Sequence, residues 1–170
     1  ARSLPLIRSC DGNEGLSAVG IAEQGESVWL AFFLASTLQD WTHILAETGD
    51  AGGAAEFTDR RRSLIEAVNR LAWDGKWFRR ATMDSGEWIG SSKNDAGQVY
   101  LNAQTWAILT DAADESRLAS AWQTVRERLL SDVGPLLLIP AYSEPQDDIG
   151  YITRFSPGSR ENGGVYMHAA

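Results

Sequence analysis

Apolar and polar positions along the chain alternate between two kinds of predicted helix. Residues 26–47 are apolar nearly all round, and a helix without a polar face is typically buried. Residues 54–72 carry apolar side chains at helical spacing with charges opposite, which predicts an amphipathic helix. The same order then repeats, with a nearly all-apolar stretch at 101–113 around Trp106 and an amphipathic one at 115–130. We therefore expect an all-α fold with an inner layer of buried helices and an outer, amphipathic layer.

Turn and loop signals interrupt this helical pattern. Trp73-Asp-Gly-Lys-Trp77 and Asp84-Ser-Gly86 predict tight turns, so residues 73–90 should form a short β-hairpin, the only place where we expect strands. Residues 131–160 hold four of the five prolines and predict a long irregular loop. Residues 162–170 predict the beginning of a further helix, so the chain supplies two helical pairs and the start of a third.

Length and composition limit the class of protein. A chain of 170 residues with 44% hydrophobic content can bury one sizeable core, so we expect residues 1–170 to form a single domain. Three aromatic side chains of the apolar helices should be more buried than three charged ones of the amphipathic helices, namely Trp29, Phe33 and Trp106 against Arg61, Glu66 and Arg126. A net charge of -8 argues against a nucleic-acid partner.

Several other partners and cofactors are not expected. The sequence has no run of eighteen apolar residues and no signal-peptide pattern, so we expect no membrane partner. Cys10 is the single cysteine, which excludes an intrachain disulfide and fits a cytoplasmic location. His43 and His168 are the only histidines, which makes a transition-metal site improbable, and no glycine-rich nucleotide loop is found.

Three short segments combine glycine with polar or charged side chains. They are Asp11-Gly-Asn-Glu-Gly15, Gly25-Glu-Ser-Val-Trp29 and Arg160-Glu-Asn-Gly-Gly164, the last followed by His168. Adjacent glycines let the backbone approach a small ligand, and a histidine near a helix start suits an anion. From the residues alone, purely structural roles for these segments stay open as alternatives. The first segment is then a polar turn, Arg160 and Glu161 form a surface ion pair, and His168 is hydrogen-bonded locally.

These segments, with Leu4-Pro-Leu-Ile7 and Trp73-Asp-Gly-Lys-Trp77, occur in the order seen in a known family. The sequence resembles the catalytic domain of glycoside hydrolase family 94. That family includes the cellobiose, cellodextrin and chitobiose phosphorylases and the terminal domain of cyclic β-1,2-glucan synthases. Its usual strings are Gly-Asp-Trp-Asn-Asp-Gly, Gly-Glu-Ser-Val-Trp and Arg/Lys-Glu-Asn-Gly-Gly-x-Tyr-x-His-Ala. The resemblance runs over essentially the whole chain.

The resemblance implies a fold and a reaction. The fold is an (α/α)6 toroid, of which this chain would form about half. The reaction is inverting phosphorolysis, in which a β-linked gluco-oligosaccharide and phosphate give α-glucose 1-phosphate and a shortened sugar. Inorganic phosphate is the nucleophile and co-substrate, so one protein carboxyl suffices as the acid and no cofactor is implied.

Site residues carry over by position. Glu14 corresponds to the general acid, Asp11 of the same loop to a substrate contact, Arg160 and Glu161 to contacts with the acceptor sugar, and His168 to the phosphate-binding histidine. The family completes its phosphate site with a downstream Thr-Gly and its donor-sugar site with an upstream Arg and Asp, all outside these residues.

Two departures from the family pattern affect the acid loop. Glu14 stands where the family has Asp, and Gly12 stands where it has a Trp that could stack on a sugar. We therefore expect the chain to be inactive by itself, and a non-catalytic helical module for carbohydrate binding or oligomerisation is the alternative. Half a ring would leave apolar flanks open along residues 28–45 and 165–170, which predicts a homo-oligomer.

Overall fold

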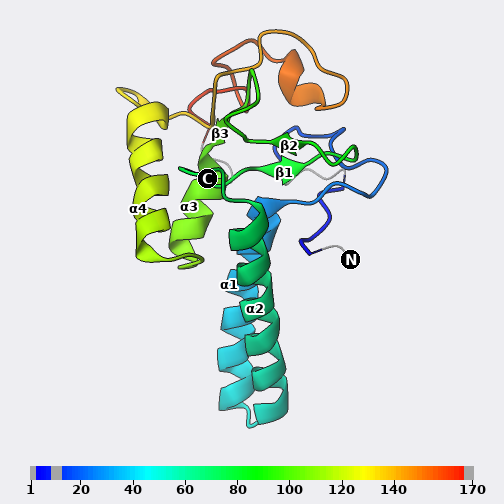
Figure 1. Cartoon of the computed structure of the whole chain (residues 1–170), viewed down its shortest axis with the longest axis vertical. Helices are drawn as coiled ribbons and strands as arrows, with labels where there is room; N and C mark the ends of the chain where they lie inside the picture. The colour runs from blue at the N-terminus through cyan, green and yellow to red at the C-terminus, as the bar shows by residue number, and fades with distance from the viewer. Residues whose placement is uncertain (1–2, 9–12, 167–170) are drawn as a thin grey trace.

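A long antiparallel helical hairpin opens the fold. The computed structural model describes residues 3–8 and 13–166, in which α1 (Val28–Glu47) is followed by α2 (Ala51–Leu71). The Ser27 hydroxyl caps α1 by accepting from the backbone N–H of Leu30 at 3.1 Å. Gly49, with a φ of 87°, ends the helix, and Asp50 caps α2. The far end of the hairpin projects away from the rest of the molecule (Figure 1).

A second helical pair packs beside the base of this hairpin (Figure 1). It consists of α3 (Leu101–Leu109) and α4 (Glu115–Thr124), and α4 continues as one π-helical turn, η2 (Val125–Leu129). The rings of Trp106 and Trp29 meet edge to face, with centroids 6.2 Å apart and an angle of 88° between their planes, which joins α3 to α1. The predicted ranges 26–47, 54–72, 101–113 and 115–130 thus correspond to the observed helices within a few residues.

Short antiparallel strands connect these helices. Within the predicted hairpin range, β1 (Ala81–Thr82) pairs with β2 (Trp88–Ile89). The expectation that strands occur nowhere else is wrong, because β3 (Val99–Tyr100) pairs with β6 (Leu138–Ile139), and β4 (Leu130–Ser131) pairs with β5 (Gly134–Pro135). The segment 131–160 is therefore less irregular than predicted, and it also contains the 3-10 helix η3 (Tyr151–Arg154).

The expected burial of the apolar helices is only partly found. Trp29 and Trp106 are half-buried, but Phe33 is 43% exposed, whereas Arg61 is half-buried and donates to the carbonyl of Thr110 at 2.9 Å. Farther along α1, Trp41 is 50% exposed. The prediction was wrong for this part of α1 because Phe33 packs on Trp106 of α3 with only part of its ring, and the tip of the hairpin projects away from the rest of the molecule (Figure 1).

The described residues form two helical pairs, and no closed ring is present among them. Val165 and Tyr166, where a further helix was expected to begin, have no regular secondary structure, and the rest of that segment lies outside the described residues. None of the helices in 3–8 and 13–166 combines the length and apolarity needed to cross a bilayer.

A core beside the helical pairs positions the candidate site. It gathers apolar residues from the first loop, the short strands and η3, including Leu16, Ile89, Leu138 and Ile152. The loops around η3 lie at the opposite end of the molecule from the tip of the α1–α2 hairpin (Figure 1). The two candidate loops, around Glu14 and around Glu161, border this core.

Candidate functional site

Glu14 lies in a loop whose backbone is held from two directions. The side-chain amide of the preceding Asn13 donates to the carbonyl of Ile7 at 2.6 Å. The carbonyl of Gly15 accepts from the N–H of Ile152 at 3.0 Å. Glu14 has a φ of 56°, a left-handed conformation that is uncommon outside glycine and is often found at functional sites. Its side chain is buried, since the residue is only 3% exposed.

The Glu14 carboxyl is hydrogen-bonded by a side chain far away in sequence. Asn102, in the first turn of α3, donates from Nδ2 to Glu14 Oε2 at 2.7 Å. Asn102 is itself fully buried. β3 runs directly into α3, so the strand register of β3 with β6 also fixes where Asn102 lies. The polar-turn alternative does not account for a buried carboxyl held by α3.

A pair of buried tyrosines lies beside this contact. The hydroxyl groups of Tyr100 and Tyr142 are 2.7 Å apart. Burial raises the pKa of Tyr100 well above 10.0, the neighbouring Tyr142 and the Glu14 carboxyl raise it further, and Arg80 acts against them. Burial likewise raises the pKa of Tyr142, so both hydroxyls remain protonated at neutral pH.

Arg80 brings a fully buried positive charge to the same region. Its Nη1 donates to the Ser27 hydroxyl at 3.2 Å, and its guanidinium lies 5.8 Å from the centroid of the Trp29 ring. The charge of Arg80 acts in the opposite direction to burial and reduces the rise in the pKa of both tyrosines. Arg80 and Glu14 are thus both buried, and the charges of both act on Tyr100 of β3.

The Arg160–Glu161 pair lies in the second candidate loop and is asymmetric. Arg160 Nε is 3.3 Å from Glu161 Oε2, and the Arg160 guanidinium packs 4.5 Å from the Phe155 ring centroid. The Glu161 side chain is 7% exposed, whereas the Arg160 side chain is 55% exposed. A simple surface ion pair does not describe this arrangement, because its acid is buried and only its base reaches solvent.

A chain of contacts connects the two loops. Asn162, next to Glu161, is hydrogen-bonded to both the N–H and the carbonyl of Tyr142, at 2.8 and 2.9 Å. Tyr142 touches Tyr100, which stands two residues before Asn102, and Asn102 holds Glu14. Hydrogen bonds and chain connectivity thus link the loop of Glu14 to the turn that carries Glu161, while the Arg160 side chain at its edge is 55% exposed.

Other predicted site residues lie elsewhere. Asp11 and His168, like Cys10, fall outside the described residues. Sequence reasoning missed Asn102, Arg80 and the tyrosine pair. A usable signal existed for one of them, because Asn102 is an amide in a mainly apolar helical stretch, and a polar group buried there needs a partner.

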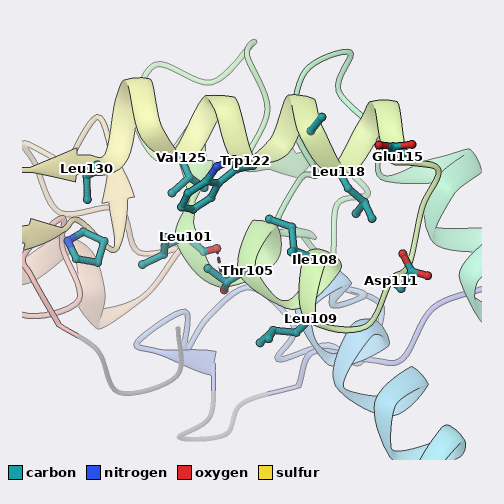
Figure 2. A pocket seen from close by; sticks show the side chains of 12 residues that line it. Leu101, Thr105, Ile108, Leu109, Asp111, Glu115, Leu118, Trp122, Val125 and Leu130 are labelled. Atoms are coloured by element: carbon teal, nitrogen blue, oxygen red, sulfur yellow. Dashed lines mark hydrogen bonds between the residues drawn. The ribbon is translucent and has the colours of Figure 1, made fainter.

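An apolar groove between α3 and α4 is separate from this site. Its volume is about 820 Å³, and it is lined by Ile108, Leu118 and Trp122 among others (Figure 2). Asp111 and Glu115 lie at one end and Leu130 at the other (Figure 2). Among the described residues, neither Glu14 nor Glu161 lines the groove, and no three acidic, histidine or cysteine side chains gather as a metal site would require.

Comparison with known proteins assigns the chain to a family. The model of the glycosyl hydrolase 94 superfamily, catalytic domain, matches residues 1–170. The chain is 39% identical to solabiose phosphorylase from Paenibacillus borealis over 98% of this chain and 22% of that protein. It is 35% identical to cyclic beta-(1,2)-glucan synthase NdvB from Rhizobium meliloti (strain 1021), over 100% of this chain and 6% of that protein. It is also 32% identical to N,N'-diacetylchitobiose phosphorylase from Vibrio proteolyticus, over 93% of this chain and 20% of that protein.

The chain thus spans about a fifth of the length of these phosphorylases, and its two candidate loops and their buried network fall within the matched stretch. The chain belongs to the glycosyl hydrolase 94 superfamily.

Proposed function

We propose that this chain is a section of the catalytic domain of an inverting β-glucoside phosphorylase, and that it carries the acid and the acceptor-sugar contacts. The reaction converts a β-linked glucoside and inorganic phosphate into α-glucose 1-phosphate and a shortened sugar, without a cofactor. Family membership supports the proposal, as do the phosphorylase names of relatives that match nearly all of this chain.

The single observation that carries the proposal is the buried Glu14 carboxyl held by Asn102. Inverting glycosyl transfer needs one carboxylic acid that protonates the leaving oxygen while a nucleophile attacks from the opposite face of the sugar. When phosphate is the nucleophile, a single such carboxyl is enough. In this mechanism Glu14 donates its proton to the leaving oxygen and becomes a carboxylate, which Asn102 Nδ2 stabilises.

Arg160 and Glu161 serve the leaving sugar in this proposal. Glu161 is buried and orients the Arg160 guanidinium through their ion pair, and the exposed part of Arg160 donates to sugar hydroxyls. The proposal keeps Asp11 as a substrate contact and His168 as a phosphate ligand on the family resemblance alone. Bulk water has little access to the acid, because Glu14 is only 3% exposed.

A chimera tests the proposal. This chain replaces the matching stretch of the Paenibacillus borealis solabiose phosphorylase, and release of glucose 1-phosphate from β-linked disaccharides is followed with and without phosphate. We expect phosphate-dependent release that Glu14→Gln lowers at least 100-fold, since proton donation by a positioned acid contributes about 10²–10⁴-fold. The exposed Glu144 offers a matched control, and Glu144→Gln should leave the rate unchanged.

The isolated 170-residue chain should show no appreciable phosphorolysis, because it corresponds to about a fifth of such a phosphorylase. Phosphate-dependent release by the chain alone would contradict this expectation. A folded chimera whose rate is indifferent to Glu14→Gln would rule out the assignment of the acid. If a folded chimera were inactive while the isolated chain bound oligosaccharides, the non-catalytic module would replace the proposal.

A further inference from the structure

In the part of the chain that the structure describes, the side-chain amide of Asn102 is hydrogen-bonded at its nitrogen but not at its oxygen. Nδ2 donates to Glu14 Oε2 at 2.7 Å. Oδ1 is also buried, and it has no hydrogen-bond partner within the described residues. A buried polar atom without a partner costs free energy, so it calls for an explanation. The side chain is fully buried, so an amide here needs a reason beyond filling space.

Gln104, two residues along the same helix, shows what a fixed structural amide looks like here. Its Oε1 accepts from the N–H of Phe78 at 2.8 Å, and its Nε2 donates to the carbonyl of Phe78 at 2.8 Å. Both ends are paired with backbone, so its orientation is determined. Among the described residues Glu14 is the one partner of the Asn102 side chain, so nothing else fixes which end faces the carboxyl.

A general acid needs a neighbour that tolerates two protonation states. Before proton transfer the carboxyl carries an O–H that must find an acceptor, and afterwards it is an ion that only accepts. A fixed N–H donor suits the second state and opposes the first. An amide offers both a donor and an acceptor at nearly the same place, provided that it is free to turn.

We propose that Asn102 is a positioning residue that holds Glu14 in both protonation states by turning its amide. Nδ2 donates to the ionised carboxyl, and after a rotation of about 180° about χ2, Oδ1 accepts from the protonated one. Each orientation leaves one end of the amide unpaired, so the turn exchanges one unpaired end for the other. The inference rests on the proposed function for the role of Glu14 as acid, but the amide turn is measurable without catalysis.

Other charged and titratable groups lie around this contact. Arg80 comes from the segment before β1, and its positive charge acts on Tyr100, as the negative charge of Glu14 does. Tyr100 from β3 and Tyr142 from the loop after β6 stay protonated, and Asp148 acts on Tyr142 by its negative charge. Asn102 is the described side chain that hydrogen-bonds the carboxyl from α3, so its own contribution is separable by substitution.

Nuclear magnetic resonance of the 170-residue chain gives the direct test. The Glu14 side-chain carboxyl ¹³C signal and the Asn102 side-chain amide signals are followed across pH. We expect both to change with one midpoint, because the amide reorients as the carboxyl gains its proton. Glu14→Gln should abolish the pH dependence of the Asn102 amide. Asn102 signals that stay constant while Glu14 titrates would overturn the inference.

Substitutions at Asn102 give a second, independent readout. In Asn102→Leu the Glu14 titration midpoint should move up by about one pH unit or more, because a hydrogen bond to an ionised oxygen is stronger than one to a neutral acid. Gln104→Leu is the matched control, since it removes a buried amide from the same helix and should leave the midpoint in place. An unmoved midpoint in Asn102→Leu would also overturn the inference.

Asn102→Asp guards against loss of folding, because it keeps the shape of the side chain. Two carboxyls at hydrogen-bond distance share one proton, so the pair should titrate in two well-separated steps. If Glu14 and the new carboxyl at position 102 each titrated independently, the contact between these two positions would be contradicted.

Failure of the function and failure of this inference are distinguishable. If the Glu14→Gln chimera keeps its activity, the acid assignment fails while the coupled titration stands. If Glu14→Gln is inactive but the Asn102 amide ignores the Glu14 titration, only the amide turn fails.

Discussion

Asn162 pairs with the backbone of Tyr142 as a neighbouring strand would. Its Oδ1 accepts from the Tyr142 N–H at 2.8 Å, and its Nδ2 donates to the Tyr142 carbonyl at 2.9 Å. The same Nδ2 also donates to the carbonyl of Phe155 at 2.8 Å. A single fully buried side chain therefore fixes the Arg160–Glu161 turn against both the tyrosine pair and the end of η3.

Replacing this side chain should destabilise the protein strongly. Asn162→Asp keeps the acceptor for Tyr142 but sets a carboxylate against the buried carbonyl of Tyr142 and the partly buried carbonyl of Phe155. We expect a loss of about 3 kcal/mol in the free energy of unfolding, measured by urea denaturation, because both carbonyls lose their donor and a charge is buried. Ser159→Ala, at an exposed position of the same turn, should change it by less than about 0.5 kcal/mol. Equal effects of the two variants would show that Asn162 does not hold the turn.

Asp84 should control the segment between the acid loop and α1. Its carboxylate accepts from the backbone N–H groups of Ala22, Gln24 and Gly25 at 2.7, 2.8 and 2.9 Å. In Asp84→Ala we expect hydrogen exchange of these three amides to accelerate about 10- to 100-fold, since about 1.4 kcal/mol corresponds to a factor of ten. Asp95→Ala, at an exposed position, should leave them unchanged. Unchanged exchange in Asp84→Ala would contradict the anchoring role.

Asp74 should make stability depend on pH. Burial raises the pKa of its carboxyl, but hydrogen bonds from Ser92 and the nearby Arg79 outweigh burial, so the pKa lies below its usual 3.8. A group with a lowered folded pKa stabilises the protein above its unfolded pKa, and this contribution is lost as pH falls through the folded value. Asp74→Asn should therefore be less stable than the parent chain at pH 7, and the difference should narrow below about pH 4.

Chemical denaturation of Asp74→Asn and of the parent chain, at pH 7 and below about pH 4, measures the difference in their free energies of unfolding. Asp147→Asn is the matched control, because Asp147 pairs with Arg154 at 3.3 Å but its side chain is 92% exposed. Its effect should stay within about 1 kcal/mol at either pH. A difference between Asp74→Asn and the parent that is the same at both pH values would show that ionisation of Asp74 does not contribute to stability.

The exposed face of α1 should promote self-association of the chain. Phe33, Trp41 and Ile44 are 43%, 50% and 48% exposed, and large apolar patches are seldom left in contact with water. Light scattering at micromolar concentration should report a dimer or larger species, which Trp41→Lys weakens. Val133→Lys, on the turn between β4 and β5, should have no effect. A stable monomer would exclude a homo-oligomer built on this face.

Local sequence patterns predicted the helices well because the physics of a helix is local. Hydrophobic period and capping residues such as Ser27 and Asp114 act within a few positions, and α1 and α4 begin next to them. Burial is not local, and Phe33 shows this, since its exposure depends on which elements lie beside α1. Apolar periodicity identifies a side that prefers burial, but it does not say whether a neighbour is present.

In the candidate site, too, residues set by local sequence could be predicted, whereas residues set by long-range contacts could not. Glu14 and Glu161 were identified because they lie in glycine-bracketed loops that resemble family strings. Asn102 was missed because its partner is 88 positions away, and no periodicity connects a helix interior to a loop at the other end of the chain. Arg80 was missed because tandem arginines normally face solvent, whereas here the second one is fully buried.

The absence of a loop between β3 and α3 limits how this chain can be recombined with relatives. Val99 and Tyr100 pair with β6, and Asn102 follows two residues after Tyr100. The register of β3 with β6 therefore fixes the position of Asn102, which contacts Glu14, and the position of Tyr100, which contacts Tyr142. A crossover placed between residues 100 and 138 would combine one parent's strand with the other parent's partner strand. Recombination libraries should therefore take residues 99–142 from a single parent and place their junctions outside this range.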